Sequence, residues 1–360
     1  MSWTLTPVAD DAGADAWFAL PGALYRGDPD WRAREAEERA VFDPARNPCF
    51  ADGAAARWLL SAADGAPAGR VAAFGRAPGP EAVGGIGFYE CVDDADAAQT
   101  LLAAAEAWLR EQGFAGADAP INFGERDRFW GLRVQGAGPA LYLEPYGQPY
   151  YAAQLEAAGY AARMESHTYR SPLAPVPFAW LEGWAEQVEA RGLRLELLAD
   201  DLPRLADTFC ALYGAAFPAA GRVRTLSRAD VEALLRGTPT ALRPRAWVVF
   251  DGEAPVGILV FAPDPTTATE DGFALTRSDV LAVAEGYRRQ GLGAALSARW
   301  LRGALEAGYA EFALVGIGRH TATMIRFATT GVGGPPAYVH RTFRRWFDGR
   351  AVEPLSLSDG

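Results

Sequence analysis

The sequence contains no lysine, so all 34 of its basic residues are arginine, and its formal net charge is -11. A broad nucleic-acid surface needs clustered basic residues that displace counterions, so we expect no nucleic-acid partner. Cysteine is scarce: Cys49, Cys91 and Cys210 are odd in number and widely spaced. This pattern excludes a disulfide framework and a cysteine-based zinc site, and we expect no metal. We attribute the missing lysine to a GC-rich genome; selection against lysine chemistry is the alternative.

Long apolar runs are absent as well. No run reaches the length that crosses a membrane, and Met1–Pro7 shows neither the basic nor the apolar part of a secretory signal. Half of the 360 residues are hydrophobic and 22% are charged, which suits two domains that each bury a core. We expect a reduced, cytoplasmic protein without a membrane partner.

Two segments half a chain apart follow the same order of residue types. Residues 58–74 and 247–261 both read as a strand, an Asp-Gly turn and a second strand. A further strand and a long helix follow in each half. Between the halves, Ser171–Pro177 holds three prolines, which disfavour helix and sheet. We therefore predict a tandem duplication with domains at 1–170 and 193–350, separated by a linker and connecting helix at 171–192.

The most informative segment follows the strand-like run Val280–Val283 and opens a helix-like run to Glu306. It reads Arg288, Arg289, Gln290, Gly291, Leu292, Gly293, Ala294. The start of a helix offers unpaired N–H groups and a partial positive charge. Glycines let the backbone approach an anion, and the arginines add full charge. The segment predicts a cradle for a cofactor that carries a pyrophosphate.

The Arg-x-x-Gly-x-Gly spacing of this segment, together with the order of the elements, resembles the GNAT superfamily of acyl-CoA-dependent N-acyltransferases. The resemblance implies a mixed α/β fold built from two tandem GNAT-like domains, and acetyl-CoA or another acyl-CoA as the cofactor. It implies that backbone N–H groups of 289–294 bind the pyrophosphate and that the strand edge at Leu281, Ala282 and Val283 pairs with the pantetheine arm. Thr321 and Met324, at the following helix, complete the expected cofactor site.

The first half lacks this cradle. Its equivalent turn is Val92-Asp93-Asp94-Ala95-Asp96, and aspartate carboxylates at a helix start occupy the place of a phosphate and repel it. We expect a degenerate N-terminal copy that keeps the fold without binding CoA there. Residues 122–132 resemble a family of bacterial two-domain GNAT-like proteins, whereas Arg32–Arg34 depart from it. The charges of 122–132 suggest an ion-paired loop; a wall of the acceptor pocket, lined by Tyr142, Tyr146, Tyr150 and Tyr151, is the alternative.

The catalytic candidates are weaker than the cofactor residues. Asp279 shares a strand face with Leu281 and Val283 and is the candidate base, relaying a proton through water; a surface charge is the alternative. The position of the tyrosine acid of many GNAT enzymes holds Ala328, so Tyr338 is the candidate substitute. His320, before the same helix, ranks below Asp279. His167 and His340 show no partner in the sequence.

The leading functional hypothesis is an N-acyltransferase, in its favoured form an N-acetyltransferase, that moves an acyl group from acyl-CoA to an amine of a small molecule or peptide. The alternative is a CoA-binding regulatory or structural protein without turnover, which the missing tyrosine favours. A tandem GNAT-like transferase that uses aminoacyl-tRNA is a third class, and the acidity of the chain and its intact cradle argue against it.

Overall fold

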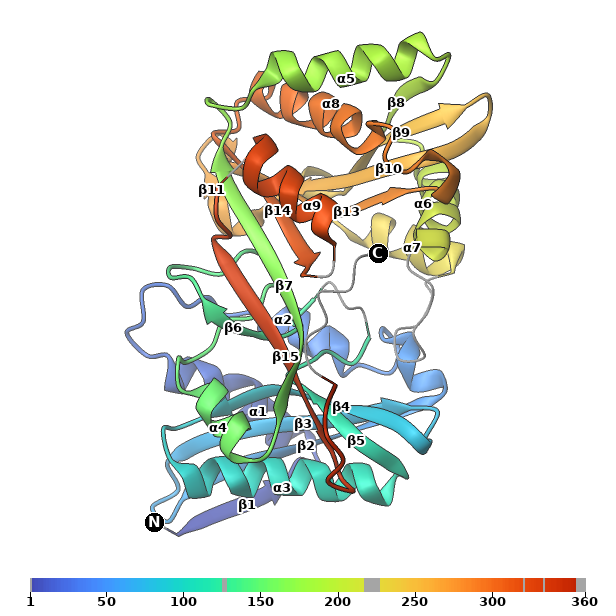
Figure 1. Ribbon diagram of the computed structural model, residues 1–360. Coiled ribbons are helices and arrows are strands. Elements are labelled where there is room, and N and C mark those ends of the chain that lie inside the picture. Colours follow the sequence, from blue (N-terminus) through green and yellow to red (C-terminus); the bar gives the residue numbers. More distant parts are fainter. Residues whose placement is uncertain (1, 125–127, 217–226, 320, 333, 354–360) are drawn as a thin grey trace.

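The computed structural model describes residues 2–124, 128–216, 227–319, 321–332 and 334–353. In this part of the chain, one continuous mixed sheet of 13 strands runs through both halves, which lie one above the other (Figure 1). The predicted mixed α/β fold with tandem halves is thereby confirmed.

The N-terminal half forms a meander, a helix, a strand, a second helix and a final strand. Its elements are β1 (Trp3–Pro7), α1 (Asp11–Leu24), α2 (Glu35–Val41), η1 (Pro48–Ala51), β2 (Gly53–Ala62), β3 (Pro67–Arg76), β4 (Gly79–Cys91), α3 (Ala95–Glu111), β5 (Phe114–Ala119), β6 (Leu132–Gln135), α4 (Tyr151–Ala157) and β7 (Ala161–Pro172).

The C-terminal half repeats this order. Its elements are α5 (Phe178–Ala190), β8 (Arg194–Leu198), α6 (Leu202–Ala216), α7 (Arg228–Gly237), η2 (Thr240–Leu242), β9 (Arg245–Asp251), β10 (Ala254–Pro263), η3 (Pro265–Thr267), β11 (Ala268–Thr269), β12 (Gly272–Phe273), β13 (Leu275–Val283), η4 (Glu285–Tyr287), α8 (Leu292–Glu306), β14 (Glu311–Gly318), α9 (Ala322–Arg326), the π-helical turn η5 (Phe327–Val332) and β15 (Tyr338–Trp346).

The last strand of each half adds to the sheet of the other half. β15 pairs with β5 and β7, and β7 pairs in turn with β14, all antiparallel. The two strands cross the middle of the molecule side by side (Figure 1). The Arg344 guanidinium lies 2.6 Å from the Asp118 carboxylate, an ion pair that joins β15 to β5. The halves are therefore joined through backbone pairing, and each completes the other.

The proline-rich segment between the halves belongs to a core. Leu173 is fully buried and Val176 is 6% exposed; both lie in the apolar cluster under α5 and α8. α5 packs along α8 at one end of the molecule (Figure 1). The domain boundary at 171–192 stays a prediction, and the structure adds that this segment supports the C-terminal half.

Helices cover both faces of the C-terminal sheet. α8 and α5 bury the face that includes Val249 and Leu259, whereas α6 covers the face with Val248 and Ile258. This alternation follows from the period of two in a strand that is buried on both sides. None of the helices in the described ranges is both long and apolar enough to cross a membrane.

Candidate acyl-CoA site

The site lies where two parallel strands separate. β13 pairs with β10 along its length but with β14 only over Leu275–Ser278. Beyond Ser278, the edge of β13 that faces β14 has no strand partner in the described chain. The β10–β13 register also shifts around Asp279, which forms a β-bulge there. The open edge at Leu281–Val283 is a place where an extended ligand can pair as an added strand.

The loop after β13 has the backbone conformation that a close anion requires. Arg289 has φ 61° and Gly291 has φ 83°, both in the left-handed region. A Cβ at Gly291 would lie 2.2 Å from Trp184 Cε3, so glycine is required there by conformation and by contact. α8 then begins at Leu292 without any side-chain hydrogen bond at its N-terminus. Its first N–H groups are thus available to an anion.

α5 holds the loop from behind. The Arg191 guanidinium donates to the Gln290 carbonyl oxygen at 2.9 Å and to its side-chain oxygen at 3.1 Å. Trp184 packs on Gly291 from the same helix. Arg288, Arg289 and Gln290 themselves are exposed. The loop is therefore preformed, while its charged groups remain accessible.

The remaining expected cofactor residues gather around this edge. Leu281, Val283, Ala294 and Met324 are partly buried and pack on one apolar cluster. Thr321 donates its backbone N–H (2.9 Å) and its hydroxyl (2.5 Å) to the Gly318 carbonyl at the end of β14. The Ala282 side chain is buried on the α6 face. His320 lies outside the described residues.

In the N-terminal half, the equivalent strand edge, at the end of β4, is closed by side chains of that half. The Cys91 N–H donates to the Tyr151 hydroxyl (3.1 Å), and the Tyr150 hydroxyl donates to the Cys91 carbonyl (3.0 Å). Gln154 donates to the Val92 carbonyl at 2.8 Å. The Asp94 carboxylate accepts the Ala97 N–H at the start of α3, as the sequence predicts. Backbone groups that a pantetheine and a phosphate would use are thus already paired, which supports the prediction of a half without CoA.

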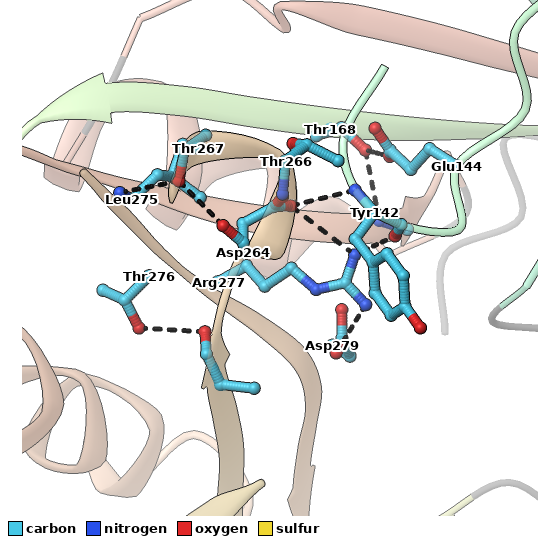
Figure 2. Close-up of polar contacts among 12 residues, drawn as sticks. Tyr142, Glu144, Thr168, Asp264, Thr266, Thr267, Leu275, Thr276, Arg277 and Asp279 are labelled. Carbon is cyan, nitrogen blue, oxygen red and sulfur yellow. Dashed lines mark hydrogen bonds and ion pairs between the residues drawn. The ribbon is translucent and has the colours of Figure 1, made fainter. Parts of the chain in front are cut away.

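Asp279, the candidate base, belongs to a buried polar network (Figure 2). Its Oδ2 accepts from Arg277 at 3.2 Å, and its Oδ1 is buried without a hydrogen-bond partner in the described residues. Arg277 also donates to the Tyr142 carbonyl, and Asp264, which is fully buried, accepts the Tyr142 N–H at 3.0 Å. The N-terminal half is therefore docked beside Asp279, and one carboxylate oxygen there lacks a donor.

Tyr338, the candidate acid, is 4% exposed and packs with Leu275 and Ala313. Its hydroxyl donates to the Pro139 carbonyl at 2.9 Å. Ala328, in η5, is fully buried. The acid role of Tyr338 stays a prediction, and it requires that the phenol exchange this hydrogen bond for one to a leaving group.

Two titratable side chains are buried at the junction of the halves, and the sequence did not identify either as buried. Glu144 accepts from the Thr168 hydroxyl, and burial raises its pKa to about 7. His340 lies with Nδ1 3.9 Å from the same carboxylate, and burial lowers its pKa to about 3. Glu144 comes from an irregular loop, where no periodicity marks a residue as buried.

His167, for which the sequence shows no partner, has one in the structure. Its Nε2 lies 3.1 Å from Glu165 Oε1, and that carboxylate also pairs with Arg341 at 3.1 Å. Glu165, His167 and Tyr169 alternate along β7 and therefore share a face. The alternation was readable from the sequence; that β15 brings Arg341 to this face was not.

We expect the Glu144→Gln variant to change how stability depends on pH. The pKa of Glu144 is about 7 in the folded chain, above its ordinary 4.5. Its neutral form therefore contributes stability that is fully present below pH 4.5 and lost as the pH rises through 7. Between pH 4.5 and 8, the free energy of unfolding of the wild type should fall by about 2–3 kcal/mol relative to the variant, which stays neutral. Urea denaturation at both pH values measures this.

Glu186→Gln, at an exposed position, is the control for this change. Equal pH dependences of stability in Glu144→Gln and in the wild type would contradict the raised pKa of Glu144.

Comparison with known proteins agrees with this geometry. Residues 209–332 match the model of the Acetyltransferase (GNAT) family. A tandem GNAT protein from the clavulanic acid biosynthesis pathway superposes with a TM-score of 0.60 at 15% identity, covering 96% of this chain and 98% of that one. A GCN5-related N-acetyltransferase from Sphaerobacter thermophilus gives 0.57 at 15% identity, covering 99% and 98%. At these identities the likeness concerns the fold.

A curated relative is more similar over a shorter stretch. Protein YghO from Escherichia coli (strain K12) is 31% identical over 150 residues, which are 40% of this chain and 38% of that protein. Well under two thirds of that relative is thus matched.

The whole chain thus shares the fold of tandem GNAT proteins. Within this fold, residues 209–332 carry the match to the Acetyltransferase (GNAT) family.

Proposed function

We propose that this protein transfers an acyl group, in the favoured case acetyl, from acyl-CoA to an amine. The observation that carries the proposal is the open edge of β13 continuing into the uncapped, arginine-bearing start of α8. Pantetheine would pair with Leu281–Val283, and the pyrophosphate would contact the backbone of 289–294 and the guanidinium of Arg288. When bound, acyl-CoA supplies the activated thioester.

The residues around Asp279 fit the acceptor end of this site. Attack of a neutral amine on the thioester carbon forms the amide, breaks the C–S bond and requires the amine to lose a proton. Asp279 Oδ1, buried and without a partner in the described residues, is the available acceptor for that proton, directly or through water. Arg277 keeps this carboxylate in place. The acceptor is a small-molecule or peptide amine whose pocket the Tyr142 loop helps to form.

The proposal includes a reducing, cytoplasmic setting. Cys49, Cys91 and Cys210 all lie in the described chain and form no disulfide. This is compatible with the compartment in which free thiols persist.

Thiol release from acetyl-CoA, followed over a panel of primary and secondary amines, tests the reaction. With an amine that turns over, Asp279→Asn should lower kcat by about 10²–10⁴-fold, because it removes the proton acceptor. The dissociation constant of acetyl-CoA should change less than about threefold, since the cradle is intact. Asp271→Asn, an exposed position before β13, is the matched control.

Two results would count against the proposal in different ways. Full turnover in Asp279→Asn would remove Asp279 from the mechanism. Tight acetyl-CoA binding without thiol release over the whole panel would favour the second candidate, a CoA-binding regulatory or structural protein. The engaged hydroxyl of Tyr338 and the buried Ala328 are the observations that support this second candidate.

A further inference from the structure

The N-terminal half contains a cavity of about 320 Å³ that the proposed reaction does not use. α1, the segment 31–38, β4, α4 and the loops near 130 and 145 enclose it, close to where β4 and β5 separate. A volume of this size accommodates a small organic molecule. Because the edge of β4 is closed by Tyr150, Tyr151 and Gln154, the cavity has no adjoining place for a pantetheine arm.

Arg70, at the cavity wall, is already neutralised. Its side chain is 1% exposed, and its two terminal nitrogens donate to both carboxylate oxygens of Glu38 at 2.7 and 3.0 Å. Its Nε is buried without a hydrogen-bond partner in the described residues. The pair with Glu38 leaves little net charge for an anion, whereas the unpartnered Nε marks a donor that a ligand oxygen can satisfy.

Glu90 is the second carboxylate beside the Arg70 guanidinium, and burial raises its pKa to about 7. It is 8% exposed, and its Oε2 accepts from the neutral hydroxyls of Tyr25 (2.6 Å) and Tyr151 (2.9 Å). Arg70 lies 3.8 Å from Oε1, so its single positive charge is shared between two carboxylates, Glu38 and Glu90. Two phenols stabilise the carboxylate without neutralising it. Glu90 is therefore placed to pair with a cation that enters the cavity.

The walls suit the same kind of ligand. The rings of Trp31, Phe88, Phe129 and Tyr146 line the cavity, and aromatic faces attract organic cations most strongly where water is excluded. Two further arginines of the lining donate to neutral carbonyls, Arg32 to those of Pro29 and Trp31 and Arg34 to that of Glu144, and Glu35 and Glu38 add carboxylates to the same wall.

We propose that this cavity binds a small organic ammonium ion, with its charge at Glu90 and its apolar body against the aromatic walls. None of the residues of the β13 edge or of the loop before α8 lines this cavity, and the proposal does not depend on turnover at that edge.

Phenethylamine, charged at pH 7.5, and 2-phenylethanol, its neutral counterpart of equal size, are suitable probes. Calorimetric titration of the full chain without CoA should show saturable binding of the amine and at least tenfold weaker binding of the alcohol. Glu90→Gln should weaken amine binding at least tenfold and leave the alcohol unchanged. Trp31→Ala should weaken amine binding about threefold or more through loss of a cation–π contact.

The Asp279→Asn variant tests whether the amine binds in this cavity or at the acceptor end of the acyl-CoA site. Binding in the cavity predicts that the variant and the wild type have the same affinity for the amine. Circular dichroism establishes that each variant is folded; if Glu90→Gln is not, Trp31→Ala decides. The proposal is overturned if the wild type shows no saturable amine binding, if the alcohol binds as tightly, or if the folded cavity variants bind the amine as the wild type does.

Discussion

Replacing Arg288 and Arg289 together by glutamate should weaken acetyl-CoA binding by at least 100-fold. Both side chains are exposed beside the uncapped start of α8. Each lost charge-assisted hydrogen bond costs about 1.5–3 kcal/mol, and 1.4 kcal/mol is tenfold in affinity. The new carboxylates also repel a pyrophosphate. Isothermal titration of acetyl-CoA measures the change.

The control is a double variant that changes the net charge of the protein by the same amount at two other positions. Arg26 and Arg46 are exposed in the N-terminal half, and their joint replacement by glutamate should leave the dissociation constant within about twofold, since neither side chain belongs to the half that carries the cradle and exposed charges are screened by salt. The wild type should bind one acetyl-CoA per chain. An unchanged affinity in the first variant would refute the cradle, and a second bound acetyl-CoA would refute the closed edge at Cys91.

The largest effect on stability is expected from Arg277→Ala. Arg277 is 6% exposed, binds the Tyr142 carbonyl and pairs with Asp279 at 3.2 Å; Asp264, fully buried, lies 3.8 Å away (Figure 2). Removing one partner of a buried network leaves uncompensated carboxylates, at a cost of about 3–5 kcal/mol in the free energy of unfolding. The loss also removes one contact that docks the two halves.

Urea denaturation followed by tryptophan fluorescence measures this change. Arg236→Ala is the control, because Arg236 pairs with Glu232 on the surface of α7 and is 63% exposed. Exposed pairs of this kind contribute about 0.5 kcal/mol or less. If Arg277→Ala cost no more than Arg236→Ala, the network would be incidental to the junction of the halves.

The features that the sequence predicted well are local ones. The carboxylate cap at Asp94 depends on a few neighbouring residues, so it is readable directly from their types. The repeated order of strands and helices follows from side-chain periodicity within each half. Catalytic residues were harder to assign, because Tyr338 and Asp279 depend on partners far away in the chain.

The sequence by itself determined the tandem fold, and it shows one turn equipped with glycines and arginines, at 288–294. Only the tertiary structure decided that β7 and β15 are exchanged between the halves, because the two halves offer chemically similar strand edges and local patterns do not choose between them. The same holds for the Arg277 network and for the Glu90 cavity. Their members lie on separate elements, and the ion pairs, hydrogen bonds and empty space among them arise only when those elements pack.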